Sequence, residues 1–365
     1  MIGDKNMIFN ISDNQFKKIM RNPNFNLPVR WEGRNFERAI SDLLDEHINE
    51  LLLFDGDKDN EYYNNVEVNI DEICLISDLL KRCICEYHRG FPSNAFDTMK
   101  KIMDILIKRP LKVYQKSGAL EPLETDRLYL FRLRGISDTA RHTRKDLFHV
   151  PSSARSMIST CRYSIAGYPS LYLTTSIELG KEEIGGTNNN LLVSRFKLIR
   201  SQQELNIRVL ELGIRPQDFF NEGREYNDAD VRTKDIRDIN FKSKDFRASY
   251  LLWYPLIAAC SFIRANKKSP FSSEYIIPQL LMQWIRKQVG RNELMGIRYF
   301  SCASIRAAEL GFDYVFPVNN TKYGEGYCSV LRDSFLLTNP VCLGDFDSIG
   351  QCERWLINCE DLDKI

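Results

Sequence analysis

The amino-acid sequence predicts an α+β fold, in which a helical N-terminal bundle is followed by a mixed β-sheet domain with helices. Apolar residues recur at helical spacing through roughly the first 115 residues. Strand-like runs begin at Leu128, and the acidic segment GALEPLETD lies between the two regions. A chain of 365 residues is long enough for two domains, so we expect a helical domain over 1–120 and a second domain over 121–365.

Three helices are expected in the N-terminal domain. The first begins at Phe36 and ends before the turn-rich segment FDGDKDNEYYNN. Its apolar face consists of Phe36, Ile40, Leu43, Leu44, His47, Ile48, Leu51 and Leu52. The second covers Ile70–Tyr87, and the third follows Pro92, with Ser93 as its expected N-cap. Together these helices predict a small bundle.

The second domain combines strand-like and helical segments. The strand-like runs are LYLFRLR, SLYLTT, LLVSRFKLI, NIRVLEL and GFDYVFPV. Helices are expected over Ala248–Ala265 and Tyr275–Val289, and this interleaving favours a mixed sheet. The apolar stretch Tyr250–Ile263 is too short to span a bilayer, so we expect it to be a buried core helix. The acidic segment CEDLD near the end is expected to be a solvated tail.

Composition excludes several classes of partner. Fifty Lys and Arg residues against 49 Asp and Glu residues give a net charge of +1, so we expect neither nucleic acid nor a membrane as a partner. Ten cysteines lack the spacings of zinc sites, and with four histidines in the chain we expect no metal. The cysteines are expected to be reduced thiols in a cytoplasmic protein, because the N-terminus lacks a secretory signal.

The stretch Cys161–Glu183 places a cation, an aromatic ring and two carboxylates beside one Gly-Tyr-Pro turn. The cation and a first ring are Arg162 and Tyr163, and Tyr172 lies on the short strand that follows the turn. Such a combination suits an anionic, ring-bearing ligand such as a nucleotide. Core packing is the alternative role for Tyr172. Glu183 adjoins apolar helix positions and therefore needs a partner or a function, whereas Glu182 is expected to face solvent.

A local surplus of basic residues precedes and overlaps this stretch. The members are Arg132, Arg134, Arg141, Arg144, Lys145, Arg155 and Arg162, with His142 and His149 among them and only Asp138 and Asp146 as acids. Guanidinium groups bind phosphates bidentately, so the cluster indicates a diphosphate ligand. A solvated loop with scattered salt bridges is the alternative.

Known phosphate-binding and esterase motifs are absent from the sequence. Ser301 stands between a strand-like run and a helix-like run, where a serine usually caps the helix. It is not in a G-x-S-x-G context, and the chain has neither G-x-G-x-x-G nor G-x-x-x-x-G-K-[ST].

From Leu128 to Val318 the chain resembles the RES family, named for its Arg, Glu and Ser. The segments FRLRG, LFHVPSSAR, CRYSIAGYPSLYLTTSIELGKEE and GIRYFSCAS carry the resemblance. They place the family arginine on Arg132, with Arg134 as a rival. The family glutamate falls on Glu183, one residue from Glu182, and the family serine on Ser301.

The resemblance implies an ADP-ribosyltransferase-like fold and an enzyme that consumes NAD by breaking the nicotinamide–ribose bond. It implies that Glu183, Arg132 and Ser301 are catalytic. Binding roles are expected for Tyr172, Arg162, Arg134, Tyr163 and His149. It also implies a toxin or phage-defence effector. The acceptor stays open among water, phosphate and a protein side chain, so an ADP-ribosyltransferase that modifies a protein is the first alternative.

The helical front half is similar to a HEPN-like domain, some members of which are ribonucleases with an R-x(4–6)-H motif. Arg82 and His88 have that spacing, which leaves a ribonuclease as a second alternative, although we favour structural roles for both residues. A third alternative is a module that binds an anionic partner without catalysis. Besides NAD, the expected partners are an antitoxin or regulatory protein and further copies of the chain.

Overall fold

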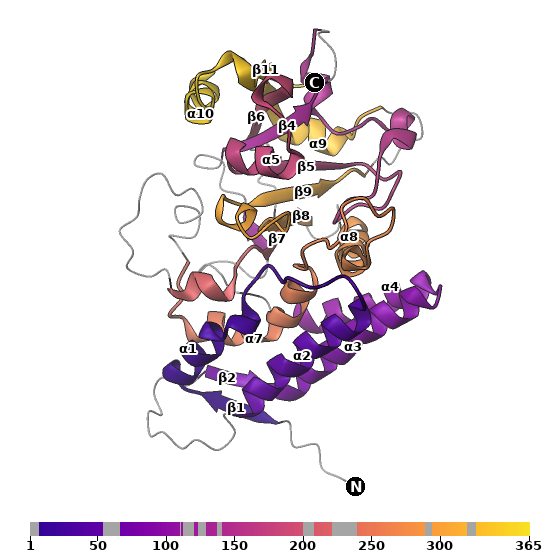
Figure 1. Cartoon of the computed structure of the whole chain (residues 1–365), viewed down its shortest axis with the longest axis vertical. Coiled ribbons are helices and arrows are strands. Elements are labelled where there is room, and N and C mark those ends of the chain that lie inside the picture. The colour runs from indigo at the N-terminus through magenta and orange to yellow at the C-terminus, as the bar shows by residue number, and fades with distance from the viewer. Residues whose placement is uncertain are drawn as a thin grey trace. The chain divides into compact units, whose positions relative to one another are not determined.

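The structure is a computed structural model of the 365-residue chain (Figure 1). It describes residues 7–53, 66–109, 111, 120–122, 129–136, 141–199, 208–220, 239–288, 294–319 and 326–365. The chain divides into two compact units. Unit 1 comprises Met1–Glu121, Ile214–Glu225 and Arg237–Trp284, and unit 2 comprises Pro122–Gly213, Tyr226–Ile236 and Ile285–Ile365.

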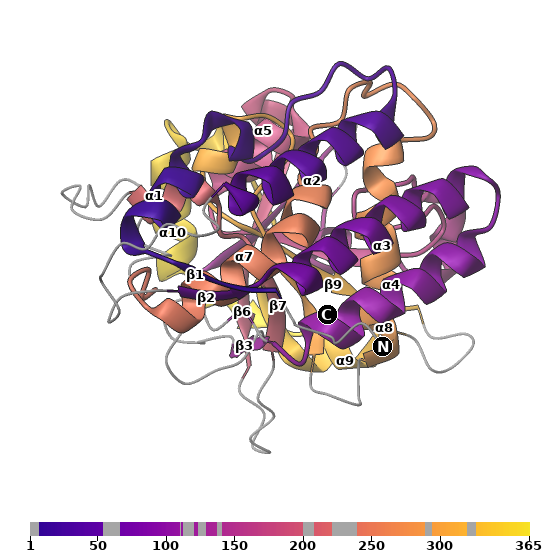
Figure 2. The same cartoon turned by 90° about the horizontal axis from the view of Figure 1, so that it is seen from below.

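Unit 1 contains the expected helices together with two short strands. Its elements are β1 (Ile8–Ile11), α1 (Asp13–Arg21), α2 (Phe36–Leu52), β2 (Val66–Asn69), α3 (Ile70–His88), α4 (Pro92–Leu106), α7 (Lys244–Ala259) and most of α8 (Ile276–Gln288). Helices α2, α3 and α4 lie side by side (Figure 2). The purely helical bundle that we expected is wrong in one respect, because β1 and β2 pair as an antiparallel two-stranded sheet.

Helix α7 is buried over nearly its whole length, which confirms the core helix predicted from its apolar sequence. The Ser243 side chain accepts a hydrogen bond from the Phe246 N–H and so begins the helix four residues before the predicted start. The Trp253 indole N–H donates to the Arg109 carbonyl at 2.8 Å, and Tyr254 reaches the Phe25 carbonyl at 3.3 Å. These contacts place α7 in unit 1, although it follows most of the sheet in sequence.

Unit 2 is built on a sheet whose strands confirm every predicted strand-like run. The strands of the sheet are β3 (Leu120–Pro122), whose first two residues belong to unit 1, β4 (Leu130–Gly135), β5 (Ser170–Thr174), β6 (Leu191–Leu198), β7 (Arg208–Leu212), β8 (Leu294–Tyr299), β9 (Asp313–Pro317), β10 (Phe335–Thr338), β11 (Val341–Cys342) and β12 (Leu362–Asp363). Their order is β12-β10-β6-β4-β5-β9-β8-β7-β3, with β11 pairing beside β6. Strands β7 and β8 are parallel, whereas β8, β9 and β5 pair antiparallel, so the sheet is mixed.

The short helix α5 (Ile177–Ile184) packs against β4 and carries the carboxylates of interest. The Ser176 hydroxyl caps it by accepting the Leu179 N–H at 3.1 Å, and Gly185 ends it with a φ of 73°. A Cβ on Gly180 would lie 2.5 Å from a methyl carbon of Leu133. The glycine therefore sets how closely α5 approaches the sheet.

One local prediction is wrong, and another is confirmed only in part. Pro92 occupies the first turn of α4 and no side chain caps that helix, so Ser93 is not the N-cap. Proline is favoured at the first helical position because it has no N–H that would need a partner. The acidic side chains of CEDLD are exposed, as expected, but the segment is not a free tail. It follows α9 (Ser329–Ser334) and α10 (Ile349–Asn358), and its last two residues form strand β12, which pairs with β10. The turn segment FDGDKDNEYYNN and most of GALEPLETD lie outside the described residues.

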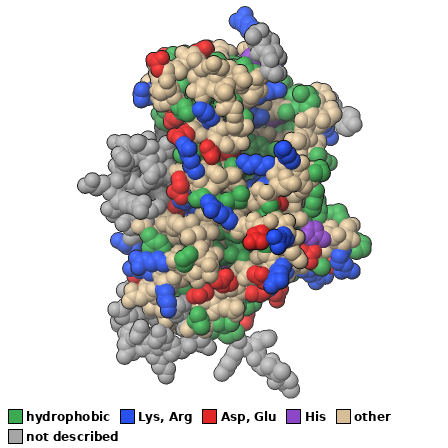
Figure 3. Space-filling view, in the orientation of Figure 1, with side chains coloured by type: hydrophobic (Ala, Val, Ile, Leu, Met, Phe, Trp, Pro, Cys, Tyr) green, Lys and Arg blue, Asp and Glu red, His purple; other side chains and the backbone are tan. Residues whose placement is uncertain are grey.

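Acidic and basic side chains are interspersed over the face shown in Figure 3, in keeping with the net charge of +1. Within the described part of the chain, no helix combines the length and the apolar character that a membrane crossing requires.

Candidate functional site

Helix α5 and the segment after β8 are joined by three side-chain contacts. The Ser301 hydroxyl donates to Glu183 Oε1 at 2.5 Å, the Ser304 hydroxyl donates to Glu182 Oε1 at 3.2 Å, and Arg306 lies 3.0 Å from Glu178. Ser301 is fully buried whereas Glu183 is exposed. A buried donor therefore anchors a carboxylate that solvent and ligands can reach.

These contacts revise two expectations for individual residues. Ser301 is not the helix cap, because Arg306 is the N-cap of the short helix Ala307–Glu309 and the Ala307 N–H donates to Ser304 Oγ at 2.9 Å. Glu182 is half-buried and bonded to Ser304, so the expectation that it faces solvent is wrong. Of the two adjacent glutamates, Glu183 is the one that contacts Ser301.

Asp313 is a site residue that the sequence did not reveal. It is the first residue of β9, is 2% exposed, and neither of its carboxyl oxygens has a hydrogen-bond partner among the described residues. Burial raises the pKa of Asp313 well above its usual range, and the nearby Glu183 carboxylate raises it further, whereas Arg162 lowers it. Asp313 and Glu183 therefore form an acidic pair in which the surroundings favour the protonated form of Asp313.

A close approach of backbone segments fixes Asp313 in place. The Thr175 hydroxyl accepts the Phe312 N–H at 2.9 Å, and the Thr175 N–H donates to the Phe312 carbonyl at 2.9 Å. Gly311 has a φ of 141°, and a Cβ there would lie 2.5 Å from Thr175 Oγ1. Only glycine fits this junction without strain, so Gly311 is needed to bring Asp313 to the start of β9.

Arg162 and two tyrosines surround the acidic pair. Arg162 is buried, and its Nη2 lies 3.5 Å from the Cys302 carbonyl. The rings of Tyr163 and Tyr299 lie 4.7 Å apart, and both residues are buried. Burial raises the pKa of Tyr299 well above its usual range, with Asp313, Glu183 and Tyr172 adding to the shift. We call Arg162, Glu183, Tyr299, Ser301 and Asp313 the Glu183 cluster.

Arg132 and Tyr172 extend this cluster across the neighbouring strands. The Tyr172 hydroxyl lies 2.8 Å from the Ser164 hydroxyl, so one end of the ring is fixed. Arg132 is half-buried, and its buried Nη1 has no hydrogen-bond partner among the described residues. Burial lowers the pKa of Arg132 to about 10, with Arg134 adding to the shift, so Arg132 remains a cation at neutral pH.

The rest of the basic surplus does not converge. Arg134 donates to the Asp146 carbonyl at 2.9 Å, and Arg144 binds the Leu337 carbonyl and the Asp361 carboxylate. Arg155 lies over the Tyr168 ring. The contacts of these residues are structural. In contrast, the charge of Arg162 acts on Asp313, and the charge of Arg132 acts on Tyr172.

His149 is held by the backbone. The ring is fully buried, with Nδ1 lying 2.9 Å from the Val150 carbonyl and Nε2 accepting the Cys328 N–H at 2.9 Å. Burial lowers the pKa of His149 to about 4, so the ring is neutral at physiological pH. Because both ring nitrogens are occupied, these contacts favour a structural role over the expected binding role.

The ribonuclease alternative gains no support from the geometry of α3. Arg82 and His88 are six positions apart, which places their side chains about 120° apart around a helix. Arg82 is exposed, and His88 contacts Glu37 and Ser273. The two residues of the motif therefore point away from each other within this chain.

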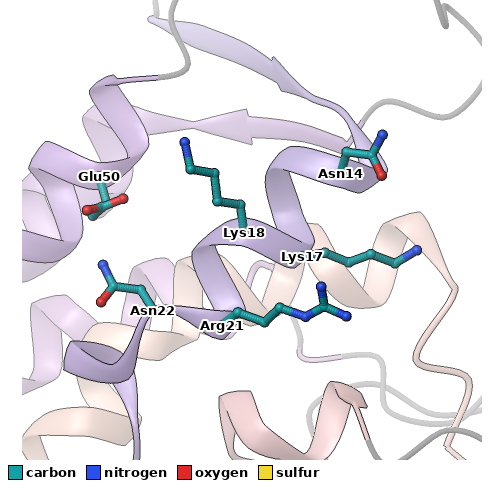
Figure 4. Close-up of a pocket in the computed structure, with 6 residues that line it drawn as sticks. All are labelled: Asn14, Lys17, Lys18, Arg21, Asn22 and Glu50. Carbon is teal, nitrogen blue, oxygen red and sulfur yellow. The ribbon is translucent and has the colours of Figure 1, made fainter.

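A separate hollow of about 460 Å³ lies on unit 1, between α1 and α2. Figure 4 shows its lining residues, which are Asn14, Lys17, Lys18, Arg21, Asn22 and Glu50. Lys17 pairs with Asp13 at 2.5 Å, and Arg21 lies over the Phe220 ring, so these two cations already have partners. Among the described residues, no three His, Cys, Asp or Glu side chains gather to hold a metal ion.

Comparison with known proteins gives one informative relative. The chain is 33% identical over 334 residues to a protein of Bacillus subtilis (strain 168) described as "Putative toxin YopC". The similarity covers 88% of this chain and 69% of that relative. No protein-family model matches the sequence. No solved structure shows significant similarity to it.

Proposed function

Because the chain belongs to the same family as the "Putative toxin YopC" of Bacillus subtilis, we propose that it is a toxin and that it acts by consuming NAD. The similarity covers 88% of the chain, and the YopC name supplies the toxin role alone. The chemistry is proposed from the Glu183 cluster and from the resemblance to the RES family.

The hydrogen bond from Ser301 to Glu183 is the observation that carries the proposal. It joins the two residues that the resemblance named as glutamate and serine, which stand 118 positions apart in the sequence. A buried hydroxyl holds the exposed carboxylate in one orientation, as a group that must meet a reacting carbon requires. Arg162 lies near the same acidic pair.

In the proposed reaction, the bond between the nicotinamide nitrogen and ribose C1′ breaks. That nitrogen is positively charged in NAD, so nicotinamide leaves as a neutral molecule and needs no proton. Positive charge then develops on the ribose, as in glycoside cleavage, and Glu183 stabilises it. When water is the acceptor, ADP-ribose and one proton are the remaining products.

The other members of the cluster have matching roles in this proposal. Arg132 and Arg162 bind the diphosphate. Arg132 has a buried guanidinium nitrogen without a hydrogen-bond partner among the described residues, which is costly until an anion pairs with it. Tyr172 stacks on the nicotinamide or the ribose. Burial and the nearby Glu183 carboxylate raise the pKa of Asp313, which favours its neutral form beside Glu183.

The test is to incubate the purified chain with NAD and to separate the products by chromatography. Nicotinamide together with ADP-ribose would identify a glycohydrolase. Nicotinamide with ADP-ribose phosphate, formed when phosphate is added, would identify a phosphorylase, and a mass increase on a protein would identify an ADP-ribosyltransferase. NAD that remains intact after hours at micromolar enzyme concentration would contradict the proposal.

A further inference from the structure

Three side chains of unit 1, those of Glu37, His88 and Ser273, form a hydrogen-bonded chain that the proposed NAD chemistry does not use; we call it the His88 relay. His88 is the last residue of α3, Glu37 lies in the first turn of α2, and Ser273 begins the short 3-10 helix Ser273–Tyr275. His88 Nδ1 lies 2.6 Å from Glu37 Oε1, and His88 Nε2 lies 3.1 Å from Ser273 Oγ. Both distances fall within the hydrogen-bonding range of about 2.6–3.2 Å for an activated nucleophile and its base.

The order of the contacts determines where the protons lie. An ionised glutamate only accepts hydrogen bonds, so the neutral His88 ring carries its proton on Nδ1 and donates it to Glu37. His88 Nε2 is then an acceptor, and the Ser273 hydroxyl donates to it. In a serine–histidine–carboxylate triad, the serine hydroxyl likewise contacts Nε2 of the histidine and the carboxylate contacts Nδ1.

The relay is open to solvent, as a site that turns over a substrate must be. The His88 side chain is 26% exposed and that of Glu37 is 49% exposed. Phe271, which is 51% exposed, stacks on Tyr87 with ring centroids 6.3 Å apart and lies 6.4 Å from the His88 ring. An accessible apolar surface therefore adjoins the serine.

We propose that Ser273, His88 and Glu37 form a second catalytic site, which hydrolyses esters that carry an apolar acyl group. Ser273 Oγ attacks the carbonyl carbon while its proton moves to His88 Nε2. The carbon–oxygen bond to the alcohol breaks, and the alcohol leaves with that proton. Water then attacks the acyl-serine, gives a proton to His88 Nε2, and releases the carboxylic acid as Ser273 regains its proton. Phe271 and Tyr87 contact the acyl chain.

The experiment treats the full chain with a fluorophosphonate probe, maps the labelled peptide by mass spectrometry, and follows hydrolysis of p-nitrophenyl butyrate. We expect label on Ser273 and none on that peptide in Ser273→Ala. Labelling should slow about 100-fold in His88→Ala and about 10-fold or more in Glu37→Gln. Ser272→Ala, which changes the adjacent serine, should be labelled at the wild-type rate.

Thermal melts accompany each variant, and Glu37→Gln keeps the test decisive if His88→Ala does not fold. Two results would overturn the inference. One is an unlabelled Ser273 in the folded wild-type chain. The other is labelling of Ser273 at the same rate in wild type, His88→Ala and Glu37→Gln, because the serine would then react without its base.

Discussion

The fully buried hydroxyl of Ser301 donates a 2.5 Å hydrogen bond to the exposed carboxylate of Glu183. The serine follows β8 and the glutamate lies on α5, so the fold of unit 2 brings together residues that are 118 positions apart. The proposed catalytic role of Glu183 depends on this contact.

Removing the Ser301 hydroxyl should impair turnover more than folding. A hydrogen bond to a charged group contributes about 1.5–3 kcal/mol, so Ser301→Ala should lower kcat for NAD cleavage by about 10- to 100-fold. Ser304→Ala is the matched control. It removes the bonds to Glu182 and to the Ala307 N–H, so it should cost about 1 kcal/mol of stability and leave kcat within about threefold. Equal kcat values for the two variants would argue against positioning by Ser301.

Asp313 should make the protein less stable as pH rises. Its folded-state pKa is raised, so the stabilisation is complete below the unfolded pKa near 4 and is lost as pH rises toward the folded pKa. Within that window the loss approaches about 1.4 kcal/mol per pH unit. Asp313→Asn has no proton to lose, so its free energy of unfolding between pH 5 and about 8 should fall less than that of the wild type. Parallel curves from denaturant titrations would refute the shift.

His149 should have the opposite dependence. Its folded-state pKa is about 4 against about 6.5 unfolded, so its stabilisation is present above pH 6.5 and is lost as pH falls toward 4. The loss amounts to about 3 kcal/mol over that window. His149→Gln does not titrate and should lose less stability there. Burial also lowers the pKa of His47, to about 3. Because His47 is present in both proteins, its contribution to the pH dependence cancels in the comparison.

Arg132 should strengthen NAD binding and lower the stability of the protein without ligand. Because its Nη1 is buried without a partner, Arg132→Met should leave the thermal midpoint unchanged or raise it. The same variant should raise KM for NAD about 10-fold or more, because a charged hydrogen bond to the diphosphate is lost. Arg134→Met is the control, because Arg134 lies on the same strand and its guanidinium donates to the Asp146 carbonyl. A marked loss of stability without a change in KM would make Arg132 a structural residue.

The sequence was sufficient for strands β4, β5, β6, β7 and β9 and for most helices because their apolar periodicity is strong, whereas the short strands β3, β10, β11 and β12 were not predicted. β5 and β6 are regular apolar runs, and both lie where the pattern places them. It did not show that α7 belongs to unit 1, because a helix that is apolar on all sides does not indicate which elements will cover it. The strands β1 and β2 were missed because each is four residues long.

The site was partly predictable. The resemblance named Glu183 and Ser301, and the structure brings them into contact, but no spacing rule relates residues that far apart. Asp313 escaped attention because one acid at the start of an apolar strand normally faces solvent. Its burial depends on pairing between β9 and β8, where it lies opposite Tyr299. A carboxylate embedded in an apolar run was the available signal.

The most direct measurement compares nicotinamide release from NAD by wild type, Glu183→Gln and Glu182→Gln, with thermal melts confirming that all three fold. These adjacent glutamates differ in their partner, Ser301 for one and Ser304 for the other. We expect Glu183→Gln to lose about 100-fold or more of the rate, because the lost charge faces the developing cation. Glu182→Gln should stay within about threefold of wild type. A Glu183→Gln protein that releases nicotinamide as fast as wild type would contradict the account.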